Sequence, residues 1–189
     1  VTRWGISLTG GRYDTEDSPE TTDGYGASIE MRHDLSEQTR IEAAIGYGEI
    51  DEPGSETETD FIGSITLIRN LKTIRLLAQY RRSVEGTGAG GVSIRDSLNL
   101  NFRRRLNEKI SAGLGARAYH SERVSGTSLE DLDYVQLRSS IIWYLSRALV
   151  IEADYRYTVI DRGGNLGESA NSNQVNVWFT YQPKTIPRL

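Results

Sequence analysis

Hydrophobic and polar residues alternate along most of the chain. Between residues 4 and 9, Trp4, Ile6 and Leu8 alternate with a glycine, a serine and a threonine. The same period of two recurs in eight further stretches, at residues 25–31, 41–47, 74–80, 98–102, 110–118, 135–143, 149–157 and 175–181. The stretch at 60–69 is also counted as a strand, although its parity is ambiguous because apolar residues occupy both faces. A period of two is typical of strands with one apolar face. The sequence therefore predicts an all-β fold of ten strands.

Short and long connections alternate between these predicted strands. The short ones lie at residues 34–39, 70–72, 105–108 and 145–148, and the long ones at 14–23, 51–59, 83–92, 121–131 and 161–172. Outer-membrane barrels sort their connections in this way, with short periplasmic turns and longer extracellular loops. We therefore expect an antiparallel up-and-down transmembrane β-barrel over residues 1–182, followed by a periplasmic tail at 183–189. Closure is expected to pair residues 4–13 with residues 173–181, or, if the chain is a fragment of a larger barrel, to need further strands or other subunits.

The aromatic residues of the apolar parity support the same orientation. If the first strand runs away from the periplasm, one group falls near the short turns: Trp4, Phe102, Trp143, Phe179 and Tyr181. A second group falls near the long connections: Tyr25, Tyr47, Phe61, Tyr80, Tyr155 and Tyr157. Two aromatic belts are typical of the two lipid interfaces. The alternative is a soluble lipocalin-like barrel with its apolar face inside.

Composition narrows the classes further. The 189 residues include no cysteine, which excludes disulfides and thiolate chemistry. No run approaches the ~18 apolar residues of a transmembrane helix. The net charge of −4 and the pI of about 5.3 argue against a nucleic-acid partner. No signal peptide is visible at Val1, so the numbering is expected to start on a mature chain or an excised domain.

The polar parity is rich in arginine. Its predicted lumen-lining charges are Arg32, Arg40, Arg75, Arg81, Arg95, Arg103, Lys109, Arg117, Arg138, Arg156, Glu30, Glu42, Glu152 and Asp154. Two interpretations remain open. One is a polar channel that favours anions or acidic sugars, and the other is a lumen plugged by arginine–carboxylate and arginine–amide networks.

The sequence gives little indication of catalysis or metal binding. His33 is placed at a short turn and His120 on the lipid-facing parity, so neither is expected to act as a base, and no enzyme activity is predicted. Acidic residues in the first two long connections either solvate these loops or gather divalent cations beside lipopolysaccharide phosphates. Their spacing defines no metal site, and no cofactor is expected. The glycine-rich residues 86–91 predict a flexible loop, since no phosphate-binding motif follows them.

Several motifs resemble one family. They are YRRSVEGTGAG at 80–90, RDSLNL at 95–100, RRRLNEKIS at 103–111, ADYRY at 153–157, SNQV at 172–175 and TYQP at 180–183. This pattern resembles outer-membrane β-barrel porins associated with exopolysaccharide export and exosortase loci. The resemblance covers about residues 60–183 and corresponds to the C-terminal portion of those generally longer barrels. It implies a barrel that serves export.

Two functions are carried forward as hypotheses. The first is an outer-membrane pore or export accessory for an anionic solute or polysaccharide. The second is a non-conducting anchor or scaffold of an outer-membrane assembly. Either would have membrane lipids and lipopolysaccharide as neighbours, with an acidic polysaccharide or other envelope proteins as further partners.

Overall fold

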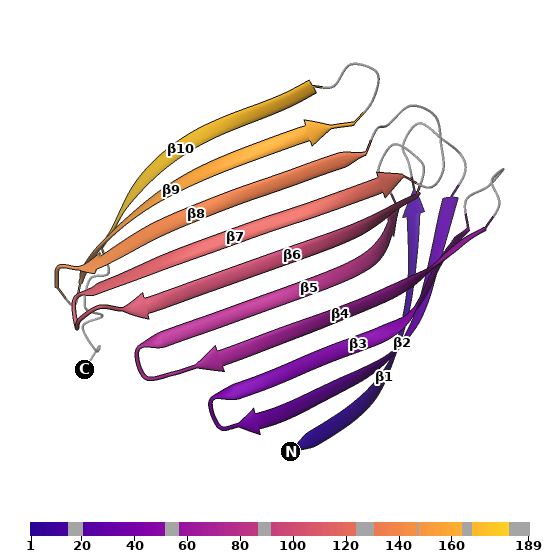
Figure 1. Cartoon of the computed structure of the whole chain (residues 1–189), viewed down its shortest axis with the longest axis horizontal. Coiled ribbons are helices and arrows are strands. Elements are labelled where there is room, and N and C mark those ends of the chain that lie inside the picture. The colour runs from indigo at the N-terminus through magenta and orange to yellow at the C-terminus, as the bar shows by residue number, and fades with distance from the viewer. Residues whose placement is uncertain are drawn as a thin grey trace, which may run out of the picture.

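The protein is a single antiparallel sheet of ten strands that follow one another in chain order (Figure 1). The computed structural model describes residues 1–14, 21–51, 57–86, 92–123, 131–146, 148–163 and 168–181. The strands are β1 (Thr2–Asp14), β2 (Thr21–Ser36), β3 (Thr39–Asp51), β4 (Glu58–Asn70), β5 (Ile74–Gly86), β6 (Val92–Arg105), β7 (Ile110–Arg123), β8 (Leu132–Tyr144), β9 (Leu149–Arg162) and β10 (Glu168–Tyr181). The predicted all-β, up-and-down architecture and its ten strands are confirmed.

The strands are longer than the alternation predicts. Residues 21–23, 83–86, 121–123 and 168–172 were expected in long connections, yet all of them belong to strands. Their glycine, serine and charged residues hide the apolar period, while the backbone ladder continues through them. Asp23, for example, pairs with Arg12 across the β1–β2 ladder, and Arg12 Nε lies 2.8 Å from Asp23 Oδ1. The tail at 183–189 and the loop at 87–91 lie outside the described residues.

The short turns are confirmed at residues 37–38, 71–73 and 106–109, and the fourth short connection lies between the end of β8 at Tyr144 and the start of β9 at Leu149. At the third turn, Asn107 Oδ1 accepts hydrogen bonds of 2.8 Å from the backbone N–H groups of Lys109 and Ile110. A polar side chain that holds the backbone in this way favours a tight turn. These turns lie at one end of the sheet, and the strand ends next to the long connections lie at the other end (Figure 1).

The expected closure of the barrel is wrong for the described strands. β1 pairs with β2 alone and β10 with β9 alone, so residues 4–13 do not pair with residues 173–181. The sheet is curved but open, with β1 and β10 at its two edges (Figure 1). Strand number does not determine closure, because closure also requires the tilt and stagger that bring the last strand to the first.

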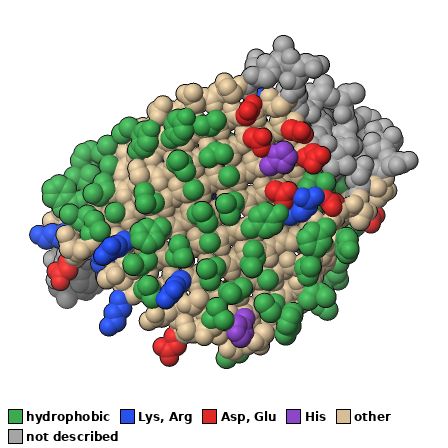
Figure 2. All heavy atoms as spheres, in the orientation of Figure 1, with side chains coloured by type: hydrophobic (Ala, Val, Ile, Leu, Met, Phe, Trp, Pro, Cys, Tyr) green, Lys and Arg blue, Asp and Glu red, His purple; other side chains and the backbone are tan. Residues whose placement is uncertain are grey.

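The two faces of the sheet differ in chemistry. Opposite residues of an antiparallel ladder lie on the same face, and the register places Ile6, Ile29 and Ile45 together on the apolar face. This face is open: Ile6 is 80% exposed and Phe179 is 70% exposed. Figure 2 shows hydrophobic side chains spread over the face, with acidic groups gathered around a histidine near the long-connection end. The described residues include only two buried hydrophobic side chains, those of Ile50 and Ile142.

One ladder is shorter than the others. β4 and β5 pair from Asn70 and Arg75 only as far as Gly63 and Arg82, after which the two strands separate. Arg82 joins the separated ends, with its Nη2 2.9 Å from Asp60 Oδ2 on β4 and its Nη1 2.7 Å from Asp96 Oδ2 on β6. An ionic contact therefore stands where backbone hydrogen bonds end.

Candidate functional site: the polar face

All the predicted lumen-lining charges except Lys109 share the polar face of the sheet. The register continues across it through facing residues, for example from Arg32 to Glu42 and from Arg138 to Arg156. Lys109 instead lies exposed in the turn between β6 and β7. Because the sheet is open, this face is a polar surface in the described structure, and its role as a lumen lining stays a prediction.

One flank of the polar face, on β2 and β3, holds paired charges. Arg40 Nε lies 2.7 Å from Asp34 Oδ1, and Arg32 Nε lies 3.6 Å from Glu42 Oε1. The Nη1 of Arg40 also approaches Glu42 Oε1 at 4.0 Å. Glu30 lies on the same face, opposite Gly5 and Ala44. The two arginines of this flank thus share two carboxylates.

The other flank, on β8 and β9, is centred on a buried carboxylate. The Asp154 side chain is 0% exposed, and its Oδ2 lies 3.0 Å from Arg156 Nε and 3.6 Å from Arg138 Nε. Asn176 Nδ2 donates to Asp154 Oδ1 at 3.5 Å, and Arg138 Nη2 lies 3.5 Å from Glu152 Oε1. Arg138 and Arg156 face each other directly. Asp154 therefore holds together two cations that would otherwise repel each other.

The centre of the face, on β5, β6 and β7, is different. Arg75, Arg81, Arg103 and Arg117 form no ion pair with any side chain that the structure describes. The residues facing Arg81 and Arg117 on β6 are Ser97 and Asn99. These groups offer hydrogen bonds but no neutralising charge.

Arg95 lies nearest the long-connection end of this centre. Among the described side chains, it is the one arginine of the centre with an acidic partner. Its Nη1 lies 2.8 Å from Glu85 Oε2, and its guanidinium carbon lies 5.1 Å from the centroid of the Tyr119 ring. Measured along β6, the arginines stand at the levels of residues 103, 99, 97 and 95. Eight residues of strand correspond to about 26 Å. We call this series, made of Arg75, Arg103, Arg117, Arg81 and Arg95, the arginine ladder.

A hollow of about 250 Å³ lies at the short-turn end of the ladder. Its lining includes Arg75, Arg103, Arg138, Asn101 and Ser140. Gly113 and Gly115 keep it open, since a Cβ on Gly113 would lie 2.7 Å from the Ser140 hydroxyl oxygen. Three guanidinium-bearing side chains thus surround one polar depression.

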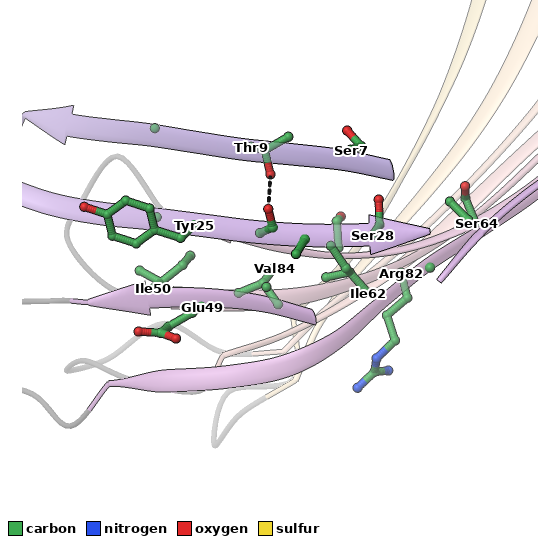
Figure 3. Close-up of a pocket in the computed structure, with 18 of the residues that line it drawn as sticks. Ser7, Thr9, Tyr25, Ser28, Glu49, Ile50, Ile62, Ser64, Arg82 and Val84 are labelled. Atoms are coloured by element: carbon green, nitrogen blue, oxygen red, sulfur yellow. Dashed lines mark hydrogen bonds between the residues drawn. The ribbon is translucent and has the colours of Figure 1, made fainter. Parts of the chain in front are cut away.

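A second hollow, of about 400 Å³, lies where β4 and β5 separate, within β1–β5. Figure 3 shows Ile62 and Val84 at this site, with Arg82 extending away from them. Thr9 Oγ1 donates to the Gly26 carbonyl at 3.5 Å on its β1 side. Most of its lining is uncharged, but it shares Arg81 with the ladder and also includes Arg82, Glu30 and Glu49.

The apolar face carries the predicted interface aromatics, which all share its parity in the register. Tyr80 and Tyr155 lie near the middle of their strands and not at the long-connection end, because the strands continue beyond the predicted bounds. The sequence analysis placed His120 on this face but missed the row of ionisable residues to which it belongs, formed by Arg82, Asp96, His120, Asp133 and Asp161. The available signal was charge on the apolar parity at five neighbouring strands.

The two histidines have ordinary polar partners. Nδ1 of His33 lies 2.6 Å from Thr2 Oγ1, and Nδ1 of His120 lies 2.7 Å from Asp133 Oδ1. Within the described ranges, no group of three or more histidine and acidic side chains is placed to hold a metal ion. The same part of the chain has no helix that could cross a membrane.

No protein-family model matches the sequence, and no curated protein matches it either. The resemblance to exopolysaccharide-associated porins therefore stays a prediction, based on the motifs at 80–111 and 153–183 alone.

Proposed function

We propose that the chain forms the wall of a β-barrel in the bacterial outer membrane, and that its polar face guides an anionic solute or polysaccharide. The observation that carries this proposal is the arginine ladder: four of its five arginines have no acidic partner among the described side chains. It runs along the polar face, directly behind an exposed apolar face. A ring or column of arginines favours anions over cations in a water-filled path.

The extent of the apolar face supports a membrane location. On β6, Asp96 and Arg104 share this face and lie eight residues apart, with Leu98, Leu100 and Phe102 between them. That distance is about 26 Å along the strand, or roughly 20 Å when the strand tilts by ~40°. Long cationic side chains such as Arg104 reach toward the headgroups from the edge of such a band. The uncharged stretch therefore fits a thin bilayer.

A bilayer also requires the edges of the sheet to be covered, since unpaired backbone groups are costly in lipid. β1 and β10 run in opposite directions, as the first and last of an even number of antiparallel strands do. In the proposed barrel these edges pair with each other after closure or with further strands. The proposal is compatible with either arrangement.

Reconstitution tests the proposal. The refolded protein should migrate differently on gels before and after heating, and in planar bilayers under a KCl gradient its reversal potential should indicate anion preference. Arg81→Glu combined with Arg117→Glu should shift this preference toward cations. The control, Lys72→Glu with Lys109→Glu, makes the same charge change in two short turns and should leave selectivity nearly unchanged. An inserted, folded protein without conductance would contradict a conducting path.

A non-conducting scaffold is the second candidate, and the flanks of the polar face favour it. The pairs of Arg40 with Asp34 and of Arg156 with Asp154 join groups within one or two neighbouring strands. Such contacts stiffen the wall without occupying the centre of a bore. Zero conductance together with high thermal stability would support this candidate.

A further inference from the structure

We infer that the hollow at the short-turn end of the arginine ladder is a binding site for one carboxylate-bearing unit of an acidic oligosaccharide. The inference deepens the proposed function and rests on it for the direction of transport, but the binding site itself can be tested separately. The hollow lies between β5 and β8 and is lined by Arg75, Arg103 and Arg138.

The first argument is the charge arrangement. Arg75 and Arg103 are direct partners in the β5–β6 ladder, so their side chains start from facing positions on the same side of the sheet. Like charges directly opposite each other destabilise a strand pair. On the flank, Asp154 offsets the same arrangement between Arg138 and Arg156. At Arg75 and Arg103 no described side chain supplies that carboxylate, and a ligand carboxylate would take the same position.

The second argument is space. Gly113 and Gly115 lie on β7 between the β6 and β8 side chains, and the missing Cβ atoms leave room in front of them. A Cβ on Gly115 would already lie 3.3 Å from Asn101 Oδ1 and 3.8 Å from the Cβ of Arg138. The guanidinium groups therefore border a depression with a glycine floor, and a planar carboxylate can approach their N–H forks there.

The third argument concerns the uncharged polar groups. Asn101 and Ser140 line the same hollow, and Asn101 Nδ2 donates to Asn99 Oδ1 at 2.8 Å further along the face. Amide and hydroxyl groups interleaved with arginines suit a ligand that carries hydroxyls as well as acidic groups. A simple anion would use the arginines only, whereas an acidic sugar would use both sets.

The remaining ladder explains why the ligand is a chain. Beyond the hollow, Arg117, Arg81 and Arg95 stand at successive levels of β6, so a second and a third acidic unit would meet further guanidinium groups. Repeated contacts on one linear ligand add by raising the effective concentration of each following unit. The hollow would then hold the first unit on the short-turn side.

Calorimetry in a zwitterionic detergent tests the site with three probes: tetragalacturonate, maltotetraose and inorganic phosphate. We expect tetragalacturonate to bind most tightly, phosphate more weakly, and maltotetraose not measurably. Arg75→Gln with Arg103→Gln should weaken tetragalacturonate binding about tenfold or more, as expected from losing charge-assisted hydrogen bonds. Gly115→Leu should also weaken it, because that side chain fills the hollow and leaves every charge in place.

The matched control is Arg32→Gln, which removes an arginine from the ion-paired flank and should change affinity by about twofold or less. Circular dichroism and heat-modifiable migration establish that each variant is folded. Equal binding of phosphate and tetragalacturonate, or unchanged binding by both hollow variants, would overturn the inference. Binding without conductance would contradict the proposed conducting path but support the binding site. Conductance without binding would contradict the binding site but support the conducting path.

Discussion

The flanks and the centre of the polar face carry the same residue type in opposite surroundings. On β8 and β9, two facing arginines share the buried carboxylate of Asp154, whereas on β5 and β6 the facing Arg75 and Arg103 have no acid that the structure describes. Arginine on the flanks is thus part of the folded wall. At the centre it contributes repulsion to the fold, and its presence there points to a ligand.

The largest loss of unfolding free energy is expected at Asp154, on the β8–β9 flank. Asp154→Ala leaves Arg156 with no acidic partner among the described side chains and Arg138 with only its 3.5 Å contact to Glu152, and removal of one partner of a buried pair costs about 3 kcal/mol or more. Denaturant unfolding in detergent measures this loss. Glu152→Gln serves as the control, because Glu152 is partly exposed and makes one contact of 3.5 Å, so that its effect should stay below about 1 kcal/mol.

A smaller difference is expected from adding one methyl group to each region. On the β2–β3 flank, a Cβ on Gly46 would collide with the Ala27 carbonyl and lie 2.7 Å from Ser28 Cα, so Gly46→Ala should cost about 1–3 kcal/mol. At the centre, the one tight contact of a Cβ on Gly115 would be with the end of the Asn101 side chain at 3.3 Å, which can move, so Gly115→Ala should stay within about 0.5 kcal/mol. Similar melting temperatures for the two variants would contradict this view of a tight flank and an open centre.

The smallest effects should have opposite signs. Arg103→Gln relieves repulsion with Arg75 and should raise stability by about 0.2–1 kcal/mol at low salt. Arg32→Gln loses its pair with Glu42 and should lower stability by no more than about 1 kcal/mol. Both effects should shrink in 1 M salt, where the Debye length falls to about 3 Å. Melting curves at two salt concentrations check the signs, and a stability loss for Arg103→Gln would show that a hidden partner exists.

Periodicity was enough to predict the ten strands and the faces of all but residues 60–69, where apolar residues stand on both faces and only the register assigns the parity. The alternation around Ile6, Ile45 and Leu100 reports which side of the sheet each residue occupies, and the register confirms those sides. It could not predict the strand ends, because residues such as Asp23 and Ser121 continue the backbone ladder without an apolar period. Nor could it predict closure, which depends on tilt and stagger accumulated over all the strands.

The arginine-rich centre was only partly predictable. Parity placed Arg75, Arg103 and Arg138 on one face, but which strands face each other at which residues is a property of register. The plugged-lumen interpretation places ion pairs across a bore, whereas the observed pairs join groups on the same strand or on neighbouring strands, as at Arg156 and Asp154. A pattern of apolar and polar positions cannot predict the distance between two charged side chains that lie two residues apart on one strand.

The strict succession of tight turns has a consequence for how such a wall can evolve. Each hairpin formed around a short turn, such as β2–β3 or β6–β7, leaves the sheet at the end where it entered. Duplicating or deleting one hairpin preserves the direction of every later strand. It also keeps the apolar side chains of those strands on the same face of the sheet. Gain or loss of a single strand would reverse the direction of every strand that follows. The short turns after it would then move to the end of the sheet that holds the long connections. The sheet can therefore gain or lose strands in genetic steps of two without reversing any later strand, whereas a step of one strand reverses every strand that follows.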